Sequence, residues 1–310
     1  MRQILTRLAL TLPVVWLVVS LVFLLIHLVP GDPIQMMLGD GATPADISAL
    51  RHQYGFDQPL PMQYVHYWAG VLRGDLGQSI RLHDSVGHLI EQRYPYTLAL
   101  TLASLGFGLV LALPSGIVAA VRRGRWADQV LSVVSLFGLS VPPIALGPVL
   151  ILVFSIALGW LPVSGANAGG TNTIEWPYLV LPSVAMGASL AAILTRMVRT
   201  AMLEELGQDY VRTARAKGLS ETAVVWRHAL PNAMVPIVTV VGLQFGALLA
   251  GAIVTETIFS WPGLGRLTVT AISNRDYALV QGCLLSIGLT YVLVNLLTDV
   301  VYRWVNPRMR

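Results

Sequence analysis

Six apolar runs divide the chain, and each is close to the roughly 20 residues that a helix needs to cross the hydrocarbon core of a bilayer. None of the six contains Asp, Glu, Lys or Arg. The first run is also longer than the apolar core of a cleaved signal peptide, which is roughly 7–15 residues. The pattern predicts an all-α integral membrane protein with six transmembrane helices, at residues 9–29, 96–121, 144–161, 176–195, 234–255 and 277–298.

The charges of the polar segments indicate on which side of the membrane each segment lies. Residues 31–95 carry seven acidic and four basic residues, so we expect an extracytoplasmic segment, with short helices at 44–54 and 62–72. Lys and Arg keep a loop on the cytoplasmic side. Since 14 of the 20 basic residues fall at the two ends of the chain and in the segments 122–125 and 196–231, both termini are expected in the cytoplasm.

A proline pair, Pro142-Pro143, interrupts an uncharged stretch that is too long for one straight span. Because proline disrupts a helix and disfavours helical geometry in the residue before it, we expect an interfacial helix at 128–139 and the third span after the prolines. Three parts follow from the whole pattern: an N-terminus with the first span (1–30), the extracytoplasmic segment (31–95), and a five-helix core (96–310) with a cytoplasmic loop at 201–231.

The polar stretch 209–231 predicts two short helices between the fourth and fifth spans. Residues 210–217 include good helix formers, and Gly218 follows where a helix would end in the left-handed conformation. Ser220 can cap a second helix that runs to Leu230 and stops at Pro231. A pair of helices between two spans suits the docking of a partner, although many basic loops of this size only set topology.

The composition limits the classes of protein that fit. The chain of 310 residues is 55% hydrophobic and 12% charged, against roughly a quarter charged for an ordinary soluble protein. Its net charge of +4 is explained by topology, so no nucleic-acid partner is expected. The single cysteine, Cys283, excludes an intrachain disulfide and a cysteine-based metal cluster. The single lysine, Lys217, follows Ala216 rather than Gly, so the chain has no Walker A loop.

Polar residues inside the apolar runs are candidates for a translocation pathway, because a buried amide or hydroxyl needs a partner. The alternative is that each one ties two helices together. Gln244 is the strongest candidate, since small residues surround it in mid-span. No catalytic or metal-ligating motif is present, which argues against an intramembrane enzyme. The candidate pathway residues are Gln244, Thr255, Gln281 and Asn295.

The stretch 209–231 resembles the EAA loop of ABC-importer permeases, in which a small-residue motif precedes a glycine and, further on, a Leu-Pro pair. Ala214, Gly218 and Leu230-Pro231 occupy those positions. Its departures from the general pattern are typical of the peptide and nickel branch of these permeases: Arg212, Thr213 and His228. Other stretches similar to that branch are 30–33, 55–59, 74–79, 256–265 and 274–277.

The resemblance implies a type I ABC importer permease fold in which the first helix of the loop inserts into a cleft on an ATPase subunit. Small Ala214 and Ala216 are then expected to let the partner approach closely, and Gly218 to fix the angle between the two helices. Replacing Gly218 with a bulky β-branched residue is expected to abolish transport. The coupling residues implied are Tyr210, Arg212, Thr213, Ala214, Arg215, Ala216, Lys217, Gly218, Leu230 and Pro231.

The resemblance also implies the partners and the substrate class. The chain would be a multi-pass permease of the plasma (inner) membrane, in contact with membrane lipid. A second related permease would lie beside it, with two ATPase subunits and an extracytoplasmic solute-binding protein. ATP and magnesium would be bound by the ATPases, and this chain would bind no cofactor. A dipeptide or oligopeptide is the expected substrate. The alternatives are nickel import by the same architecture and a proton-driven secondary transporter.

Overall fold

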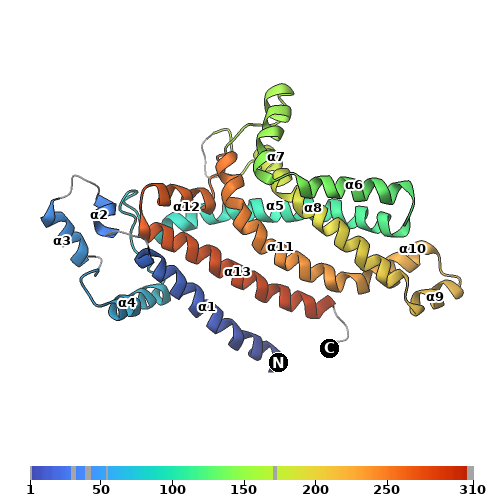
Figure 1. Ribbon diagram of the computed structural model, residues 1–310, viewed down its shortest axis with the longest axis horizontal. Coiled ribbons are helices and arrows are strands. Elements are labelled where there is room, and N and C mark those ends of the chain that lie inside the picture. The colour runs from blue at the N-terminus through green and yellow to red at the C-terminus, as the bar shows by residue number, and fades with distance from the viewer. Residues whose placement is uncertain (1, 29–32, 39–42, 54, 170–172, 306–310) are drawn as a thin grey trace. The chain divides into compact units, whose positions relative to one another are not determined.

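The computed structural model describes residues 2–28, 33–38, 43–53, 55–169 and 173–305, and these residues form helices and no strand (Figure 1). Within these described ranges, five helices are long and apolar enough to cross a membrane, and they confirm five of the six predicted spans. They are α1 (Arg2–Leu28), α5 (Val86–Val121), α8 (Trp176–Leu206), α11 (Leu230–Ile258) and α13 (Tyr277–Val305).

The third predicted span is a broken element. The chain bends sharply between α6 (Trp126–Ser140) and α7 (Pro143–Leu150), and α7 continues as a π-helix, η1 (Ile151–Ala157). The division at Pro142-Pro143 is therefore confirmed. Residues 143–157 would rise only about 23 Å as helix, so α7 and η1 alone are short for a bilayer. The count reaches six spans only when the bent pair is taken as one.

Several helix bounds differ from the sequence-based expectations. The second span was expected to begin at Tyr96, but α5 begins ten residues earlier and includes Glu91 and Arg93. A run without charge marks the depth of the membrane, whereas the helix itself continues into the polar region. The expected helices at 44–54 and 62–72 are confirmed as α3 (Pro44–Gln53) and α4 (Leu60–Arg73). Two short helices were not predicted: α2 (Pro33–Leu38) and α12 (Leu264–Ser273).

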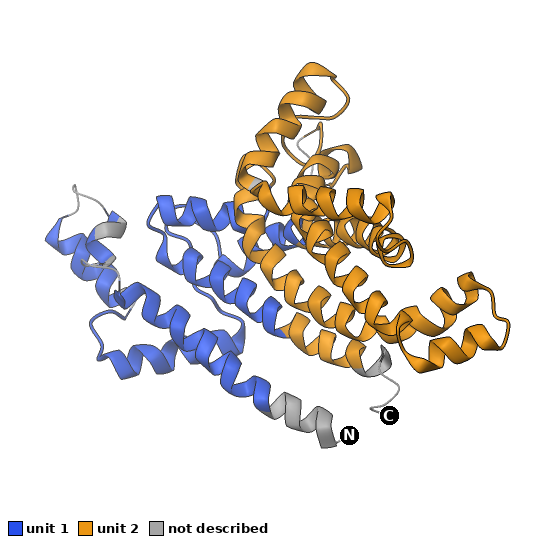
Figure 2. Ribbon diagram, turned by 45° about the vertical axis from the view of Figure 1, so that its right-hand side comes forward, with its two compact units in different colours: residues 1–97, 262–292 blue, residues 98–261, 293–310 orange. Residues whose placement is uncertain are grey.

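The chain divides into two compact units, residues 1–97 with 262–292 and residues 98–261 with 293–310 (Figure 2). The first unit has a core where the start of α5 meets α12 and the start of α13, with Val86, Leu264 and Cys283 buried in it. The backbone N–H of Leu264 donates to Thr97 Oγ1 at 2.7 Å. The predicted division at 30 and 95 follows topology rather than packing and stays a prediction.

The second unit is organised around α8, which packs against residues 98–121 of α5 and against α6 and α11. Glycines allow the closest approach: a Cβ at Gly187 would lie 2.7 Å from the carbonyl oxygen of Ser104, nearer than real side chains approach. Towards the far end of α8, Val198 and Met202 are fully buried in a cluster with Ile237 of α11. α8 therefore carries tertiary contacts to its last turns, where the loop at 209–231 begins.

Candidate functional site

The loop between α8 and α11 contains a short amphipathic helix, α9 (Asp209–Ala216). Val211 and Ala214 are buried and pack with Leu206 of α8 and Val224. The remaining side chains of α9 are exposed, and the exposed set is mostly polar: Asp209, Tyr210, Arg212, Thr213, Arg215 and Ala216. The predicted first helix of the loop is confirmed, and it presents a polar, largely basic face to the outside of the chain.

Gly218 ends this helix in the left-handed conformation, with φ of 80°. The N–H of Gly218 donates to the carbonyl of Arg215 at 2.9 Å, and the N–H of Leu219 donates to that of Ala214 at 3.3 Å. No atom lies within 4 Å of a Cβ built at Gly218. The backbone, and not crowding, therefore requires glycine here, because other residues adopt a positive φ only with strain.

An ion pair closes the turn between α9 and the next helix, α10 (Glu221–Ala223). Arg215 donates from Nε and Nη2 to the two carboxylate oxygens of Glu221, at 2.7 and 3.2 Å. These bonds lower the pKa of Glu221 and raise that of Arg215. Ser220 caps α10 by accepting from the N–H of Ala223 at 3.4 Å, as the sequence predicted.

The second helix of the loop does not stop at Pro231, and this corrects the sequence-based expectation. α10 passes into a π-helix, η2 (Val224–Ala229), and then directly into α11, so that residues 221–258 form one continuous helix. Proline interrupts an α-helix because it has no N–H to donate and its ring clashes with a carbonyl one turn back. The wider turn of η2, immediately before Pro231, changes the hydrogen bonding at that place and lets the helix continue.

Side-chain bonds tie the start of α9 to the start of α11. Asn232 Nδ2 donates to the hydroxyl oxygen of Tyr210 and to the carbonyl oxygen of His228, each at 3.0 Å. The Tyr210 hydroxyl in turn donates to Glu205, in the last turns of α8. Helix α9 is thus attached to both neighbouring spans, so a force on α9 would reach α8 and α11 together.

Ala214 packs inside the loop with Val211 and Val224 and is only 6% exposed. Its small size therefore serves this internal packing, and its role towards an ATPase stays a prediction. Ala216, by contrast, is exposed, as the expectation requires. Lys217 and Leu230 lie at the end of α9 and the start of α11, exposed and half-buried respectively.

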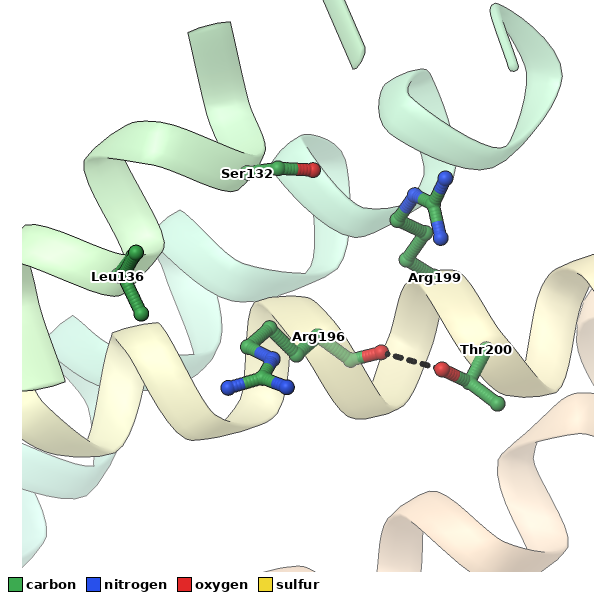
Figure 3. Close-up of a pocket in the computed structure, with 5 residues that line it drawn as sticks. All are labelled: Ser132, Leu136, Arg196, Arg199 and Thr200. Carbon is green, nitrogen blue, oxygen red and sulfur yellow. Dashed lines mark hydrogen bonds between the residues drawn. The ribbon is translucent and has the colours of Figure 1, made fainter. Parts of the chain in front are cut away.

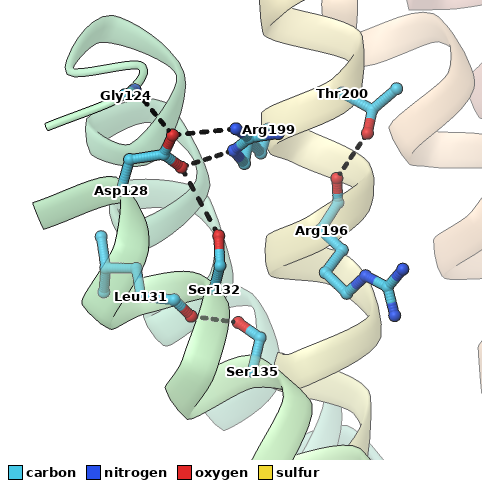
Figure 4. Close-up of polar contacts among 8 residues, drawn as sticks. All are labelled: Gly124, Asp128, Leu131, Ser132, Ser135, Arg196, Arg199 and Thr200. Carbon is cyan, nitrogen blue, oxygen red and sulfur yellow. Dashed lines mark hydrogen bonds and ion pairs between the residues drawn. The ribbon is translucent and has the colours of Figure 1, made fainter. Parts of the chain in front are cut away.

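A second polar contact, which the sequence patterns did not predict, joins α6 to α8 (Figure 4). Arg199 donates to Asp128 from Nε at 2.6 Å and from Nη2 at 2.9 Å, and the N–H of Gly124 donates to the same carboxylate at 3.0 Å. The Asp128 side chain is 7% exposed. One feature of the sequence could have predicted this contact. Asp128 is the sole acidic residue between Glu91 and Glu175, and a lone carboxylate in such an apolar region needs a basic partner.

The four pathway candidates lie in different surroundings. Gln244 and Asn295 are half-buried on α11 and α13, and Thr255 is buried with its hydroxyl donating to the carbonyl of Gly251 at 3.5 Å. Gln281 donates to the carbonyl of Val22 on α1 at 3.1 Å, which is a contact that ties helices. Their pathway role stays a prediction. The described residues contain no group of three or more His, Cys, Asp or Glu that could hold a metal ion.

Comparison with known families agrees with the helical fold. Residues 112–310 match the family described as binding-protein-dependent transport system inner membrane component, and residues 1–101 match the corresponding N-terminal family of such membrane components. The chain therefore belongs to the binding-protein-dependent ABC importer permeases, which are multi-pass inner-membrane components and not enzymes. Such a permease works with ATPase and solute-binding partners.

Among individual proteins, the chain is similar to the glutathione transport system permease protein GsiC. It is 43% identical to the protein of Escherichia coli strain K12 and 44% identical to that of Salmonella choleraesuis strain SC-B67, over 100% of this chain and 99% of each relative. The inward-facing MetNI methionine ABC transporter has the same fold, with a TM-score of 0.56 at 22% identity over 70% of this chain and 96% of that chain. An amino acid ABC transporter gives a TM-score of 0.54 at 15% identity, over 70% and 94%.

Proposed function

We propose that this chain forms half of the translocation pathway of an ATP-driven importer of small peptides, beside a second related permease. The observation that carries the proposal is the continuity of the loop at 209–231 with the spans. α9 is packed on the end of α8 by Val211, and η2 passes into α11 without a break. A helix held in this way can transmit the closure of two ATPase subunits to the spans, which then open towards the binding protein.

The orientation that this function requires has both termini and α9 in the cytoplasm. The distribution of Arg and Lys supports it, because basic segments resist translocation. ATP and magnesium would be bound by the ATPases and not by this chain. The exposed face of α9, with Arg212 and Arg215, would then contact the ATPase, and Gly218 would fix the angle between α9 and the helix that follows.

A peptide is the substrate class that the relatives favour. The GsiC proteins are named for transport of glutathione, which is a tripeptide, and they match this chain over its full length. Nickel import by the same architecture is the second candidate, since the loop has the sequence motif shared by the peptide and nickel branch. The family excludes the proton-driven alternative.

ATP-dependent uptake into proteoliposomes tests both the architecture and the substrate. The vesicles would hold this chain with its co-purifying partners and the binding protein, and they would be offered a labelled dipeptide, glutathione and nickel in parallel. We expect uptake of a peptide that needs both ATP and the binding protein. Uptake of nickel alone would keep the architecture and overturn the peptide assignment. Uptake without ATP would contradict the importer function.

A further inference from the structure

A cavity of about 350 Å³ lies beside the Asp128–Arg199 ion pair, on the face formed by α6 and α8 (Figure 3). Its volume is within the range of roughly 300–1,000 Å³ that is usual for ligand sites. It is lined by Ser132 and Leu136 from α6 and by Arg196, Arg199 and Thr200 from α8. Two arginine residues therefore line one small cavity.

The two arginines are used very differently within the chain. Arg199 is committed to Asp128 through two hydrogen bonds. Arg196 is exposed, its guanidinium points away from Asp128 (Figure 4), and it forms no ion pair or side-chain hydrogen bond with any described residue. The Thr200 hydroxyl donates to the carbonyl of Arg196 at 3.0 Å, so the donors left for a ligand are those of the arginines.

The charge at this cavity favours an anion. No acidic residue lines the cavity among the described residues, and the nearby carboxylate of Asp128 already accepts hydrogen bonds from Arg199, Gly124 and Ser132. Arg196 forms no ion pair with any residue that the structure describes. A guanidinium is shaped to donate two parallel bonds to a phosphate or carboxylate, so an oxyanion is the group that completes the site.

The exposed apolar side chains beside the cavity favour a lipid as the source of that oxyanion. Leu136 of α6 lines the cavity and is 58% exposed, and Phe137 beside it is 71% exposed. Apolar side chains that are this exposed at a bilayer contact acyl chains, whereas a free anion would gain nothing from them. Basic pockets between transmembrane helices on the cytoplasmic side are suited to phospholipid head groups.

We propose that this cavity binds the phosphate of an anionic phospholipid of the inner leaflet, with Arg196 as its main ligand and the acyl chains along α6. The proposal rests on the orientation given under the proposed function, which places Arg196 at the cytoplasmic surface. The lipid would neutralise Arg196 and hold α6 against α8 on the side opposite to the Asp128 carboxylate.

Lipid retention by the assembled transporter tests the site without ATP or solute, so its failure is distinct from failure of the import function. Wild type, R196Q and the control R123Q would be purified into detergent with phosphatidylglycerol or phosphatidylcholine, and retained lipid counted by native mass spectrometry. Arg123 is an exposed basic residue of the α5–α6 turn outside the cavity. We expect R196Q to retain phosphatidylglycerol on the order of fivefold more weakly, which corresponds to about 1 kcal/mol for one arginine.

Four outcomes would overturn the proposal. The first is an equal loss of retained lipid in R196Q and R123Q, and the second is retention of phosphatidylcholine as strong as that of phosphatidylglycerol. The third is displacement of the lipid by inorganic phosphate at comparable concentration, which would make the site one for a free anion. The fourth is retention by the isolated chain that disappears when the second permease is bound, which would make this face a subunit interface. Because Arg196 is exposed and unpaired among the described residues, R196Q is expected to fold, and size-exclusion chromatography checks this.

Discussion

Two ion pairs of this chain show how burial decides what a charged residue contributes. Asp128 is 7% exposed and Arg199 is 29% exposed, with two short bonds between them. Asp209 is 95% exposed and contacts Arg212 at 3.3 Å. A buried charge that loses its partner is costly, whereas an exposed pair is worth between nothing and about 1 kcal/mol.

Replacing Asp128 with Asn is therefore expected to lower the stability of the chain on the order of 2 kcal/mol, because Arg199 would remain part-buried without a counter-ion. The matched control is D209N, which removes an exposed carboxylate and is expected to change stability by less than about 0.5 kcal/mol. Unfolding of the purified protein in detergent, followed by heating or by denaturant, measures both. Equal effects of the two variants would show that the ion pair does not hold α6 to α8.

Single residues also show what the sequence could and could not predict. The left-handed Gly218 and the Ser220 cap were predictable, because each depends on a local backbone geometry that few residues provide. The inward position of Ala214 was not, since it depends on contacts with Val224 and Leu206 that only the folded loop brings together. The Asp128–Arg199 pair joins residues 71 positions apart, and spacing alone does not select Arg199 over Arg196.

At the scale of elements, hydropathy predicted where helices cross the membrane better than where they end. A charge-free run measures the depth of hydrocarbon, so α5 and α8 continue beyond it into polar residues. The expectation that proline ends a helix was confirmed at Pro142-Pro143 and was wrong at Pro231. The difference is that η2 changes the hydrogen bonding before Pro231, while at Pro142 the chain leaves the helix altogether. Periodicity does not reveal a π-turn of this kind.

The roles of the buried and the exposed face of α9 can be tested separately by placing leucine at one alanine on each face. A214L places a larger side chain in the buried contact with Val224, and overpacking of this kind costs roughly 1–3 kcal/mol. It is expected to loosen α9 and to speed tryptic cleavage after Lys217. A216L changes an exposed position, so it should leave the cleavage rate unchanged and weaken binding of the ATPase.

Trypsin digestion of the detergent-solubilised chain and co-purification of the ATPase measure these two effects. If A214L digests no faster than wild type, the internal packing of α9 is unimportant for its position. If A216L binds the ATPase as well as wild type does, the exposed face of α9 is not the docking face.

For the whole molecule, the arrangement of helices in the membrane determines what each surface can contact. Two family matches together cover most of the chain, residues 1–101 and 112–310. The similarity to GsiC extends over the full length of this chain. In the proposed transporter, a related permease forms the other half of the pathway and two ATPases bind on the cytoplasmic side. This assembly requires α9 on the cytoplasmic side and the segment from α3 to α4 on the outer side.

Cysteine labelling tests this topology directly. The chain has one cysteine, Cys283, which is fully buried, so new cysteines can be labelled over a low background. We expect S48C in α3 to react with a membrane-impermeant maleimide in intact cells, since Ser48 is exposed. T213C in α9 should react only after the membrane is opened. Labelling of T213C in intact cells would invert the proposed orientation.

We propose that α9 transmits the work of the ATPases to the spans, and that this requires the angle between α9 and the next helix that Gly218 fixes. The most direct measurement is the number of peptides imported per ATP hydrolysed by proteoliposomes carrying G218V, with G74V as the control. Gly218 and Gly74 both have a positive φ, 80° and 76°, and neither has an atom within 4 Å of a built Cβ. Both substitutions therefore impose a similar backbone strain of about 1–2 kcal/mol, one in the coupling loop and one at the end of α4. We expect G218V to abolish uptake while the transporter remains assembled in the membrane, and G74V to retain normal coupling. Normal uptake per ATP by G218V would contradict the coupling role of α9.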